Sequence, residues 1–574
     1  MTDRRLGVYI CYCGGNISDY VEVEKVREAI SRDPGVVVAK TTVFACSDAA
    51  QEEMIEDIKS NRLDGLVVAS CSPKLHLYTF RAMAERAGLN PYQYVQVNLR
   101  EQDSWVHQHD KKNATEKGIR LVRAGIAKCS LTEPLSTMRI DTAPRVLVIG
   151  AGVAGLRAAL SLSDMGLTVY VIERESGVGG WTGQFGRMYP NDNRGSDLIN
   201  SLHLEVKQRD NITIYTRAEL MEKSGSIGDF SVVVRAGQNE KISLNVGAII
   251  VATGFDVYKP AAGEFGHGHK KVITLPEFKK LLDNSNGNLT YEGRTVKDMA
   301  YIYCVGSRQP QEMENPHLYC SRYCCTAAVH TALEVNKRDR TIHQFHLYRD
   351  MRTYGRYELL YKQALNDGSK FIKYADDDYP QVENAGDKIR IKVKDQLTQG
   401  DEFDIHVDLL VLVTGMVPRE NAHLVEVLKL PVGKDGFFNE IHPKLRPVET
   451  VIDGVFIAGA SQGPKTLAES VASSLAAVSK SAALLMKGYV DLEPLIAKID
   501  PEKCVWCDEC TNACPYGAIE KGSYDDKEVA RIIPSLCKGG GACVPLCPRD
   551  AIDVAGYTDV QITAMIDSLI KEVK

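Results

Sequence analysis

The placement of the cysteines limits this chain more than any other feature of its sequence. Of the 16 cysteines in 574 residues, all but Cys129 fall into three groups, and we expect Cys129 to be a lone structural thiol. Clustered cysteines in a large chain more often bind metal or carry out redox chemistry than form disulfides. The net charge of −6 and the lack of a long apolar run give no indication of a nucleic acid or a membrane as partner. The first 15 residues have no signal-peptide core, so we expect a cytosolic location.

The C-terminal cysteines have the spacing of a two-cluster ferredoxin. The stretch CVWCDECTNACP, Cys504 to Pro515, reads C-x2-C-x2-C-x3-C-P, and CKGGGACVPLCP, Cys537 to Pro548, departs from it only at Gly540. In such modules the last cysteine of each run binds the other cluster. We therefore expect a [4Fe-4S] cluster on one set and a [3Fe-4S] or labile [4Fe-4S] cluster on the other. The first set is Cys504, Cys507, Cys510 and Cys547, and the second is Cys514, Cys537 and Cys543. The alternatives are a structural or zinc site for the first set and an empty site for the second.

A dinucleotide-binding fingerprint lies near residue 150. RVLVIGAGVAGLRAALSLSDMGLTVYVIER places Gly150, Gly152 and Gly155 in G-x-G-x-x-G order between an expected strand and an expected helix. The next strand ends at the acidic Glu173. Glycines at these positions let backbone amides approach a pyrophosphate, and the carboxylate is placed to bind a ribose.

Later segments indicate a flavin, FAD, as the dinucleotide. GAIIVATGF and DLLVLVTGMVP resemble the crossover strands of flavoproteins with two dinucleotide-binding lobes, and GVFIAGASQGPKTLAESV resembles their late FAD motif. We expect Lys465 to lie near the isoalloxazine and to favour an anionic reduced flavin; the alternative is a lysine that faces solvent at a helix start. The other expected FAD-binding residues are Arg174, Gly180, Thr253, Gly254, Gly415, Gly459, Ala460 and Thr466.

The second lobe lacks the fingerprint that would bind a nicotinamide donor. Near 300–308, where that fingerprint belongs, the chain reads AYIYCVGSRQ, with the single glycine Gly306. No C-x-x-C pair stands beside the flavin motifs for dithiol exchange. An enzyme that takes its electrons from NAD(P)H on its own is therefore disfavoured.

Two more groups of cysteines lie outside the ferredoxin motifs. Cys304, Cys320, Cys324 and Cys325 fit no common metal spacing, and the residues alone leave open whether they bind a cluster or are reactive or buried thiols. Cys11, Cys13, Cys46 and Cys71 each follow an expected strand, and Asp103 follows a fourth. Because the carboxyl ends of parallel strands meet at one edge of a sheet, we expect a [4Fe-4S] cluster there, with Asp103 as a candidate ligand. The alternative is cysteine acting as a small apolar residue at strand ends.

With these groups around an FAD site, the sequence resembles the A subunit of heterodisulfide reductase over nearly its whole length. The segments that carry the resemblance are CYCGGN, FACSDAAQ, SCSPKLH, NLREQDSWVH, CVGSRQ, YCSRYCC, YRDMRTYGRYELLY and AGASQGPKTLAESV. The resemblance implies an FAD and iron–sulfur subunit that passes electrons within a larger complex, in some members by sending the two electrons of a pair to different acceptors. It also implies [4Fe-4S] clusters at the two cysteine groups above. Implied partners are B- and C-like iron–sulfur subunits, a small electron-input subunit or a dehydrogenase or hydrogenase, ferredoxin, and a second copy of the chain.

The chain departs from that family at four points. Asp103 stands where members usually have cysteine, YPNDNRGSDLIN lacks the cysteines that many members carry, no ferredoxin insertion interrupts the flavin domain, and Gly540 replaces a cysteine. A carboxylate is a harder ligand than a thiolate, so the potential of a cluster bound by Asp103 should differ.

The expected fold class is α/β. It comprises a small parallel-sheet N-terminal domain, a two-lobed thioredoxin-reductase-like FAD domain and a C-terminal bacterial-type ferredoxin module of the α+β type, which ends in a short amphipathic helix at 560–573. The N-terminal domain is expected at 1–135 and the ferredoxin module at 491–574. The FAD domain is expected in two parts, 143–256 and 403–490, with the second lobe between them at 257–402. The expected function is electron transfer as an oxidoreductase subunit. The alternatives are a self-sufficient NAD(P)H-dependent flavin oxidoreductase and a non-catalytic scaffold that carries clusters.

Overall fold

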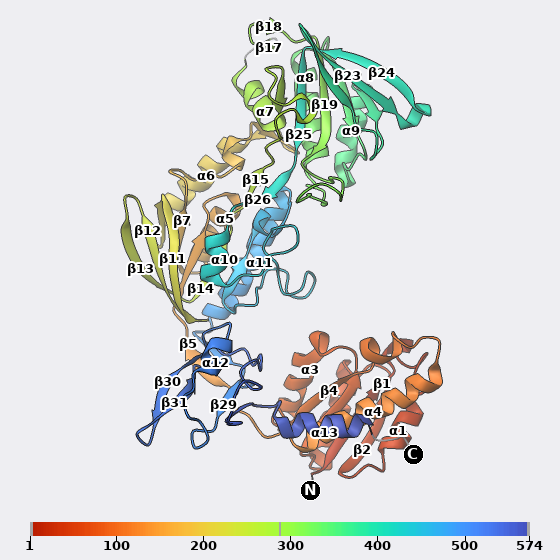
Figure 1. Cartoon of the computed structure of the whole chain (residues 1–574), viewed down its shortest axis with the longest axis vertical. Helices are drawn as coiled ribbons and strands as arrows, with labels where there is room; N and C mark the ends of the chain where they lie inside the picture. Colours follow the sequence, from red (N-terminus) through yellow and green to blue (C-terminus); the bar gives the residue numbers. More distant parts are fainter. Residues whose placement is uncertain (1–3, 286, 288, 571–574) are drawn as a thin grey trace. The chain divides into compact units, whose positions relative to one another are not determined.

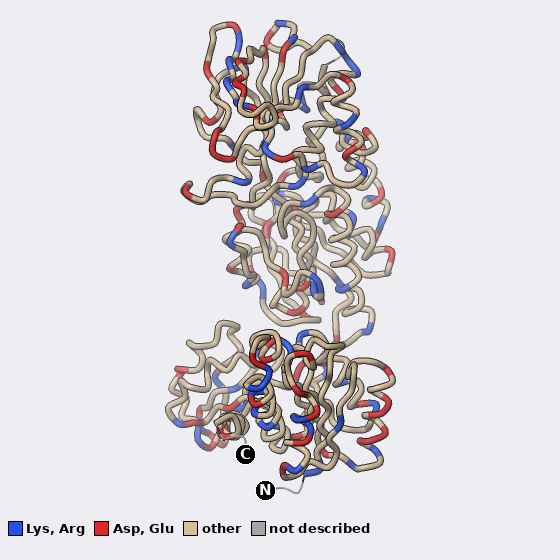
Figure 2. Tube along the Cα trace, turned by 90° about the vertical axis from the view of Figure 1, so that its right-hand side faces the viewer, with Lys and Arg blue, Asp and Glu red and all other residues tan. Residues whose placement is uncertain are grey.

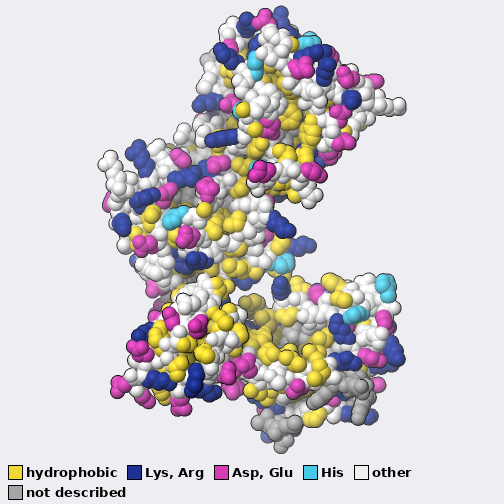
Figure 3. Space-filling model, in the orientation of Figure 1, with side chains coloured by type: hydrophobic (Ala, Val, Ile, Leu, Met, Phe, Trp, Pro, Cys, Tyr) yellow, Lys and Arg dark blue, Asp and Glu magenta, His cyan; other side chains and the backbone are white. Residues whose placement is uncertain are grey.

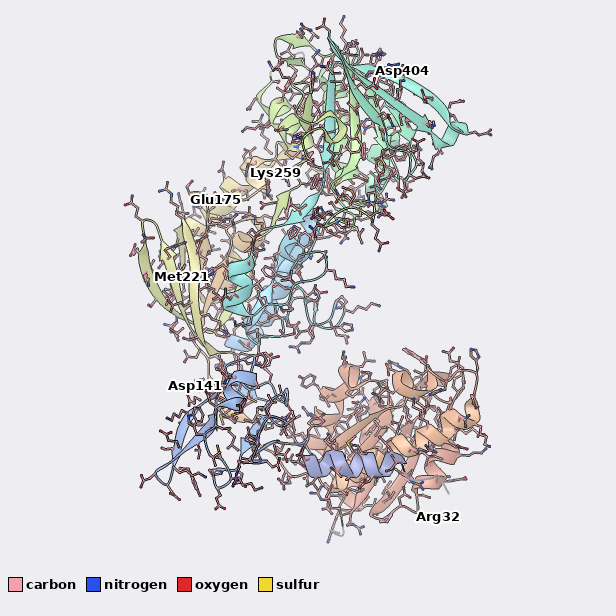
Figure 4. All side chains as sticks on the ribbon, viewed as in Figure 1. Arg32, Asp141, Glu175, Met221, Lys259 and Asp404 are labelled. Carbon is pink, nitrogen blue, oxygen red and sulfur yellow. The ribbon has the colours of Figure 1, made fainter. Side chains whose placement is uncertain are left out.

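A computed structural model describes residues 4–285, 287 and 289–570 of the chain. These residues form two compact units, one made of the described residues up to Ile140 and from Asp491 on, the other of Asp141–Val490. Asp141, labelled in Figure 4, begins the second unit. Positive and negative residues are interspersed along the trace of both units (Figure 2). None of the helices in the described residues is long and apolar enough to cross a membrane.

The N-terminal part of the first unit is a four-stranded parallel sheet in the order β2-β1-β3-β4. The two central strands, β1 (Leu6–Cys11) and β3 (Gly65–Ser70), are buried along their whole length, as continuous apolar runs in a parallel sheet require. Helices α1 and α4 contribute to the core on one face and α2 and α3 to the core on the other. The remaining bounds are β2 Val36–Thr42, β4 Tyr94–Asn98, α1 Val23–Ile30, α2 Asp48–Ser60, α3 Pro73–Arg86 and α4 Lys111–Ser130.

The C-terminal part of the first unit has the small α+β fold expected of a ferredoxin. It contains two antiparallel strand pairs, β29 with β32 and β30 with β31, and the short helix α12. The final helix α13 lies along α4 (Figure 1), where Gln561 donates a hydrogen bond to the carbonyl of Leu131 at 2.9 Å. The bounds are β29 Ala497–Ile499, α12 Glu509–Ala513, β30 Ile519–Tyr524, β31 Lys527–Ile532, β32 Ile552–Val554 and α13 Asp559–Ile570. The last residues of the expected helix lie outside the described residues.

Helix α13 carries apolar side chains that remain exposed. Only Gln561 on this helix is buried. The space-filling view shows hydrophobic side chains gathered over the ferredoxin part of the unit (Figure 3). The exposed apolar residues of α13 are Val560, Ile562, Ile566, Leu569 and Ile570.

The first lobe of the second unit is a five-stranded parallel sheet in the order β10-β7-β6-β14-β27, with a three-stranded antiparallel sheet beside it. Helices α5, α6 and α11 bury their apolar sides against the parallel sheet in one hydrophobic core (Figure 1). The strands are β6 Arg145–Ile149, β7 Thr168–Glu173, β10 Ile212–Thr216, β11 Ala218–Ser226, β12 Asp229–Ala236, β13 Glu240–Val246, β14 Ala248–Val251 and β27 Val455–Ile457. The helices are α5 Val153–Asp164, α6 Gly195–Lys207, α10 Ala422–Leu428 and α11 Leu467–Leu485.

The second lobe repeats this plan. Its parallel sheet has the order β16-β25-β19-β20-β21, and its antiparallel sheet is β22-β23-β24. The strands are β16 Val272–Thr274, β19 Asp298–Val305, β20 His343–Tyr348, β21 Lys370–Lys373, β22 Gln381–Ala385, β23 Lys388–Asp395, β24 Asp401–Val407 and β25 Leu409–Thr414. The helices are α7 Leu275–Asn284, α8 Cys324–Arg338 and α9 Glu358–Asn366.

Short paired strands join the two lobes. β15 (Phe255–Val257) pairs antiparallel with β26 (Met416–Pro418), so the chain enters and leaves the second lobe side by side. Lys259, labelled in Figure 4, marks the entry. A hairpin of β8 (Arg187–Met188) and β9 (Asn193–Arg194) extends from the first lobe toward α7 and α8 of the second. The remaining short strands are β5 Met138–Asp141, β17 Thr290–Tyr291, β18 Arg294–Thr295 and β28 Tyr489–Leu492.

Candidate functional site

The glycine-rich loop between β6 and α5 depends on its glycines for close backbone contacts. At Gly150, where φ is +105°, a Cβ would lie 2.4 Å from the carbonyl oxygen of Ala252, and at Gly155 it would lie 1.8 Å from that of Gly150. Gly152 caps α5 and has no described atom within 4 Å of the Cβ position. The loop therefore leaves open space at a helix N-terminus, where a phosphate binds well.

Glu173, at the end of β7, is buried and holds the glycine-rich loop in place through hydrogen bonds to the backbone. Its Oε2 accepts a hydrogen bond from the backbone N–H of Ala151 at 2.7 Å, and its Oε1 accepts one from the N–H of Glu175 at 3.0 Å. The side chain lines two pockets that meet at the loop. A carboxylate has further lone pairs for a ribose hydroxyl, so this geometry fits the role expected for Glu173.

Most of the expected FAD-binding residues surround one pocket. Gly150, Gly152, Glu173, Gly180, Thr253, Gly254, Ala460 and Lys465 line it, and Arg174 lines the adjoining pocket. The other four support the walls. Gly155 packs under the loop, Gly459 lies against Ala154, Gly415 lies beside Ser321, and Thr466 caps α11 by accepting a hydrogen bond from the N–H of Glu469.

The aromatic wall of this pocket was not predicted from the sequence. Trp181 stacks between Phe185 and Phe255, with ring centroids 6.1 and 6.4 Å away. Arg419 donates a hydrogen bond from Nε to the carbonyl of Phe255 at 3.2 Å and adds a positive charge to both pockets. Arg419 directly follows the segment DLLVLVTGMVP, and this position could have identified it as a pocket residue. No feature of the sequence indicates that Trp181 stacks in the pocket wall. A cationic and aromatic lining of this kind suits a dinucleotide.

Lys465 lies in the lining of this pocket. A lysine near the isoalloxazine, rather than one that faces solvent, requires this placement. Burial lowers its pKa, with Arg322 acting in the same direction and Glu440 and Glu469 opposing. A buried ammonium at this point would interact strongly with any negative charge on a bound ring system.

The structure brings Cys304, Cys320, Cys324 and Cys325 together. Cys304 stands near the end of β19 with a positive φ of 62°, and the other three lie at and before the start of α8. Burial raises the pKa of the Cys324 thiol well above its ordinary value, and the three neighbouring thiols raise it further. Four thiols that destabilise one another as thiolates are a suitable donor set for an iron–sulfur cluster, which supplies the compensating positive charge.

The cysteine set and the flavin-type pocket share a wall. The backbone N–H of Met416, which lines the pocket, donates a hydrogen bond to Ser321 Oγ at 2.9 Å. Arg322 forms an ion pair with Glu469, which closes the capping box at the start of α11. Ser321 and Arg322, which stand between Cys320 and Cys324 in the sequence, thus contact Met416 in the pocket wall and the start of α11 beside it.

The N-terminal cysteines also converge, at the carboxyl edge of the first sheet. Cys11 Sγ accepts hydrogen bonds from the N–H groups of Cys13 and Ala45, at 3.2 and 3.4 Å. Burial raises the pKa of Cys71 to about 11, with Arg100 lowering it and Cys13 and Cys11 raising it. Cys46 acts on Cys11 in the same way. The convergence expected from the strand ends is thus present in the structure.

Asp103 does not belong to this cysteine group in the structure. Its carboxylate points into the core against Gly118 of α4, where a Cβ would lie 3.0 Å from Oδ2, and both of its oxygens lack hydrogen-bond partners among the described residues. Burial raises its pKa to about 7, and Lys117 is the one charged group that opposes the rise. The turn at 100–104 is a π-type turn, which rotates Asp103 inward and leaves Arg100 and Glu101 at the thiols. This placement does not support the ligand role expected of Asp103.

We predict that Asp103→Asn stabilises the N-terminal domain at pH 8. The folded-state pKa of about 7 lies above the ordinary value of 3.8, so the native state holds a proton that the unfolded state has lost. Stability therefore falls as pH rises from about 4 to 7, by up to roughly 4 kcal/mol. Asparagine removes that dependence. Hydrogen–deuterium exchange of the α4 amides at pH 5 and pH 8 measures the effect, and loss of iron from the domain in this variant would instead show that Asp103 is a ligand.

The C-terminal cysteines form two sets, as their spacing predicts. Cys504, Cys507, Cys510 and Cys547 line one small pocket. Burial raises the pKa of Cys543, and the thiols of Cys537, Cys514 and Cys510 raise it further, which places the second set together. Backbone N–H groups donate to the sulfurs in both sets, including Ala530 to Cys504 at 3.3 Å and Ala518 to Cys514 at 3.4 Å. Such bonds to sulfur help to set a cluster's potential.

Gly540 faces open space. No described atom lies within 4 Å of the position that its Cβ would take, and its φ lies outside the left-handed region. A larger side chain is therefore tolerated at this position, which corresponds in spacing to Cys507 of the first run.

Comparison with known proteins finds family models for two parts of the chain. Residues 497–554 match a family model described as a 4Fe-4S dicluster domain, and residues 144–297 match one described as pyridine nucleotide-disulphide oxidoreductase. Among solved structures, thioredoxin reductase from T. acidophilum aligns with 60% of this chain and 97% of its own, at 17% identity and a TM-score of 0.41.

Curated relatives align over nearly the whole chain. One of the iron–sulfur A subunits of the CoB–CoM heterodisulfide reductase of Methanopyrus kandleri is 36% identical over 92% of each chain. The A subunit of the H(2):CoB-CoM heterodisulfide,ferredoxin reductase of Methanothermobacter thermautotrophicus is 34% identical over 90% of this chain and 91% of its own. The expected fold class and the resemblance to this family are confirmed, and the chain belongs to the family of heterodisulfide reductase A subunits, which are flavin and iron–sulfur oxidoreductases.

Proposed function

We propose that this chain is the subunit of a heterodisulfide-reductase-like complex in which a bound FAD exchanges electrons with an iron–sulfur cluster on Cys304, Cys320, Cys324 and Cys325. The observation that carries the proposal is the wall that this cysteine set shares with the pocket, through Ser321 and Met416. Ser321 directly follows Cys320 in the chain, so one hydrogen bond links the cysteine set to the wall of the pocket. The pyrophosphate would lie at the N-terminus of α5 and a ribose at Glu173.

Three further cluster sites complete the proposed electron path. They are a [4Fe-4S] cluster on Cys11, Cys13, Cys46 and Cys71, another on Cys504, Cys507, Cys510 and Cys547, and a [3Fe-4S] or labile [4Fe-4S] cluster on Cys514, Cys537 and Cys543. The convergence of the thiols in each set supports them. The domain boundaries expected from the sequence, at 135, 143, 257, 403 and 491, also remain predictions.

The proposed partners follow from the names of the relatives. One belongs to an H(2):CoB-CoM heterodisulfide,ferredoxin reductase, and the relative from Methanosarcina mazei belongs to a ferredoxin:CoB-CoM heterodisulfide reductase. For this chain we propose ferredoxin, B- and C-like iron–sulfur subunits, a small electron-input subunit or a dehydrogenase or hydrogenase, and a second copy of the chain, acting in the cytosol. The flavin would split electron pairs between two acceptors in such a complex.

The test is reduction of the full chain, purified without oxygen, by NADH or by reduced ferredoxin. We expect bound FAD that ferredoxin reduces rapidly and NADH does not, because the second lobe lacks a nicotinamide fingerprint. In Cys325→Ser the flavin should remain while ferredoxin-dependent reduction slows, and Cys129→Ser, which changes the thiol outside all three groups, should behave as the native chain does. Rapid reduction by NADH alone would favour the self-sufficient oxidoreductase, and absence of FAD would favour the scaffold.

We predict that Lys465→Ala lowers the midpoint potential of the bound flavin. The ammonium in the pocket would favour the anionic reduced form, and its loss should cost about 1.4 kcal/mol, or roughly 30 mV for a two-electron couple. Lys480→Ala, on the exposed side of α11, is the matched control and should leave the potential unchanged. A Lys465 variant with native potential and native semiquinone yield would show that this lysine only marks the helix start.

A further inference from the structure

A second cavity in the same unit adjoins the flavin-type pocket. It has a volume of about 680 Å³, within the range of small-molecule sites. Val153, Phe185 and Leu467 line both spaces, so any molecule in the cavity would lie next to the bound flavin. The other walls come from the β8–β9 hairpin, α6, α7, the start of α8 and one side of α11. The role assigned above to the quoted segments that contribute to its walls does not explain this cavity.

The walls of the cavity suit a flat apolar molecule. Four aromatic rings line it, those of Phe185, Tyr189, Tyr323 and Tyr357. Tyr189 and Tyr357 meet edge to face at a centroid distance of 5.1 Å, and the hydroxyl of Tyr323 donates a hydrogen bond to the carbonyl of Thr414. Most other lining residues are aliphatic. Such walls favour an aromatic body over a charged or flexible one.

One buried amine faces into this apolar space. Lys279 is only 7% exposed and donates a hydrogen bond from Nζ to the carbonyl of Arg187. The charged groups around it are Glu334 on α8, at 3.5 Å, Asp192 on the hairpin and Asp283 on α7. Burial lowers the pKa of Lys279 and raises that of Glu334, which brings the two pKa values toward each other, and the two groups lie close enough to exchange a proton.

Behind Lys279, titratable groups continue to the surface. Donor atoms of Asp192, His330 and Glu334 lie within 4.8 Å of one another, and His330 Nε2 is 3.2 Å from Asp192 Oδ1. Asp192 Oδ2 is in turn 2.9 Å from Nζ of Lys337, whose side chain is 61% exposed. The three donors have the geometry for a metal ion, but the two lysines already balance the two carboxylates. The charge count therefore favours a proton path over a metal site.

We propose that the cavity binds a quinoid molecule, a flat apolar ring with a reducible carbonyl, and that Lys279 protonates that carbonyl oxygen. The reaction rests on the proposed function for its electrons, since the reduced flavin would give two electrons and one proton. Lys279 gives the second proton, so the quinone becomes a hydroquinone and the flavin is oxidised. Glu334, His330 and Asp192 then return a proton to Lys279 from the side of Lys337.

Binding is tested first, by calorimetry of the flavin-free full chain with 2-methyl-1,4-naphthoquinone. Ala472→Trp places a large ring in the cavity from an exposed position on α11 and should abolish binding. Ser479→Trp, on the same helix outside the cavity lining, should bind as the native chain does. Equal binding by the native and Ala472→Trp chains would overturn the proposal. A native dimer that Ala472→Trp converts to a monomer would assign the cavity to a contact between copies instead.

The proton donor is tested by single-turnover oxidation of the reduced, FAD-loaded chain by the same quinone. We expect Lys279→Met to slow the reaction by about a hundredfold and to remove the fall in rate at high pH, whereas the exposed neighbour in Lys280→Met should have no effect. Should Lys279→Met fail to fold, Lys279→Met combined with Glu334→Gln removes both charges of the pair together. A native rate and pH profile in either variant would overturn the role of Lys279, and stoichiometric zinc or iron bound through His330 would overturn the proton path. Absence of FAD would contradict the proposed function while leaving the binding result intact.

Discussion

Gly155→Ala is expected to destabilise the flavin lobe by about 3 kcal/mol and to abolish flavin retention. The new Cβ would stand 1.8 Å from the carbonyl oxygen of Gly150 and 3.4 Å from the side chain of Val148. The nearest atom belongs to the backbone of the same loop, so no side-chain rotation relieves the clash. Thermal unfolding followed by FAD fluorescence, together with the FAD content of the purified chain, measures both effects.

Gly152→Ala is the matched control for that experiment. Its Cβ would meet no described atom within 4 Å, and its backbone φ of −76° suits alanine. The stability of the flavin-free chain should therefore change by less than about 1 kcal/mol. Because Gly152 lines the pocket, the methyl group would enter the space of the pyrophosphate and weaken FAD binding. If both variants lost the same stability, the cause would not be the contact between the Cβ of residue 155 and the carbonyl oxygen of Gly150.

The parts of the fold that were predictable are those fixed by local pattern. Continuous apolar runs such as Leu6–Cys11 and Gly65–Ser70 predict buried parallel strands, and a parallel sheet brings its strand ends to one edge. The convergence of the cysteines at that edge follows from this geometry without knowledge of the tertiary structure. The glycine loop was predictable for a similar reason, because Gly150 and Gly155 are required by contacts within one β–α unit.

The unpredictable parts depend on the direction of single side chains or on contacts between distant segments. Asp103 follows its strand as expected, but a π-type turn rotates it by enough to bury it against Gly118. Lys279 and Asp192 lie far apart in sequence and come near each other because the hairpin of the first lobe reaches α7 and α8 of the second. Neither periodicity nor spacing carries that information.

Gly540→Cys is expected to convert the second ferredoxin cluster from a three-thiolate to a four-thiolate site. The position is open, and its backbone conformation accepts a side chain without strain. A fourth thiolate adds negative charge and holds the corner iron, so the potential of the cluster should fall toward that of its neighbour on Cys504, Cys507, Cys510 and Cys547. In the native chain the cluster should have the higher potential, and it would collect electrons or pass them to a partner.

Electron paramagnetic resonance of the full chain, purified without oxygen, distinguishes the two states. In the oxidised chain, [4Fe-4S] clusters are silent, so an S = 1/2 signal from a [3Fe-4S] cluster is visible despite the other clusters. That signal should be present in the native chain and absent in Gly540→Cys, with about one more iron per chain in the variant. Gly541→Cys is the matched control, because its φ of +72° opposes a side chain and its position is one residue out of register. A native chain that shows no oxidised signal and holds two equivalent [4Fe-4S] clusters would mean that another ligand completes the site, and the expected difference in potential would then disappear.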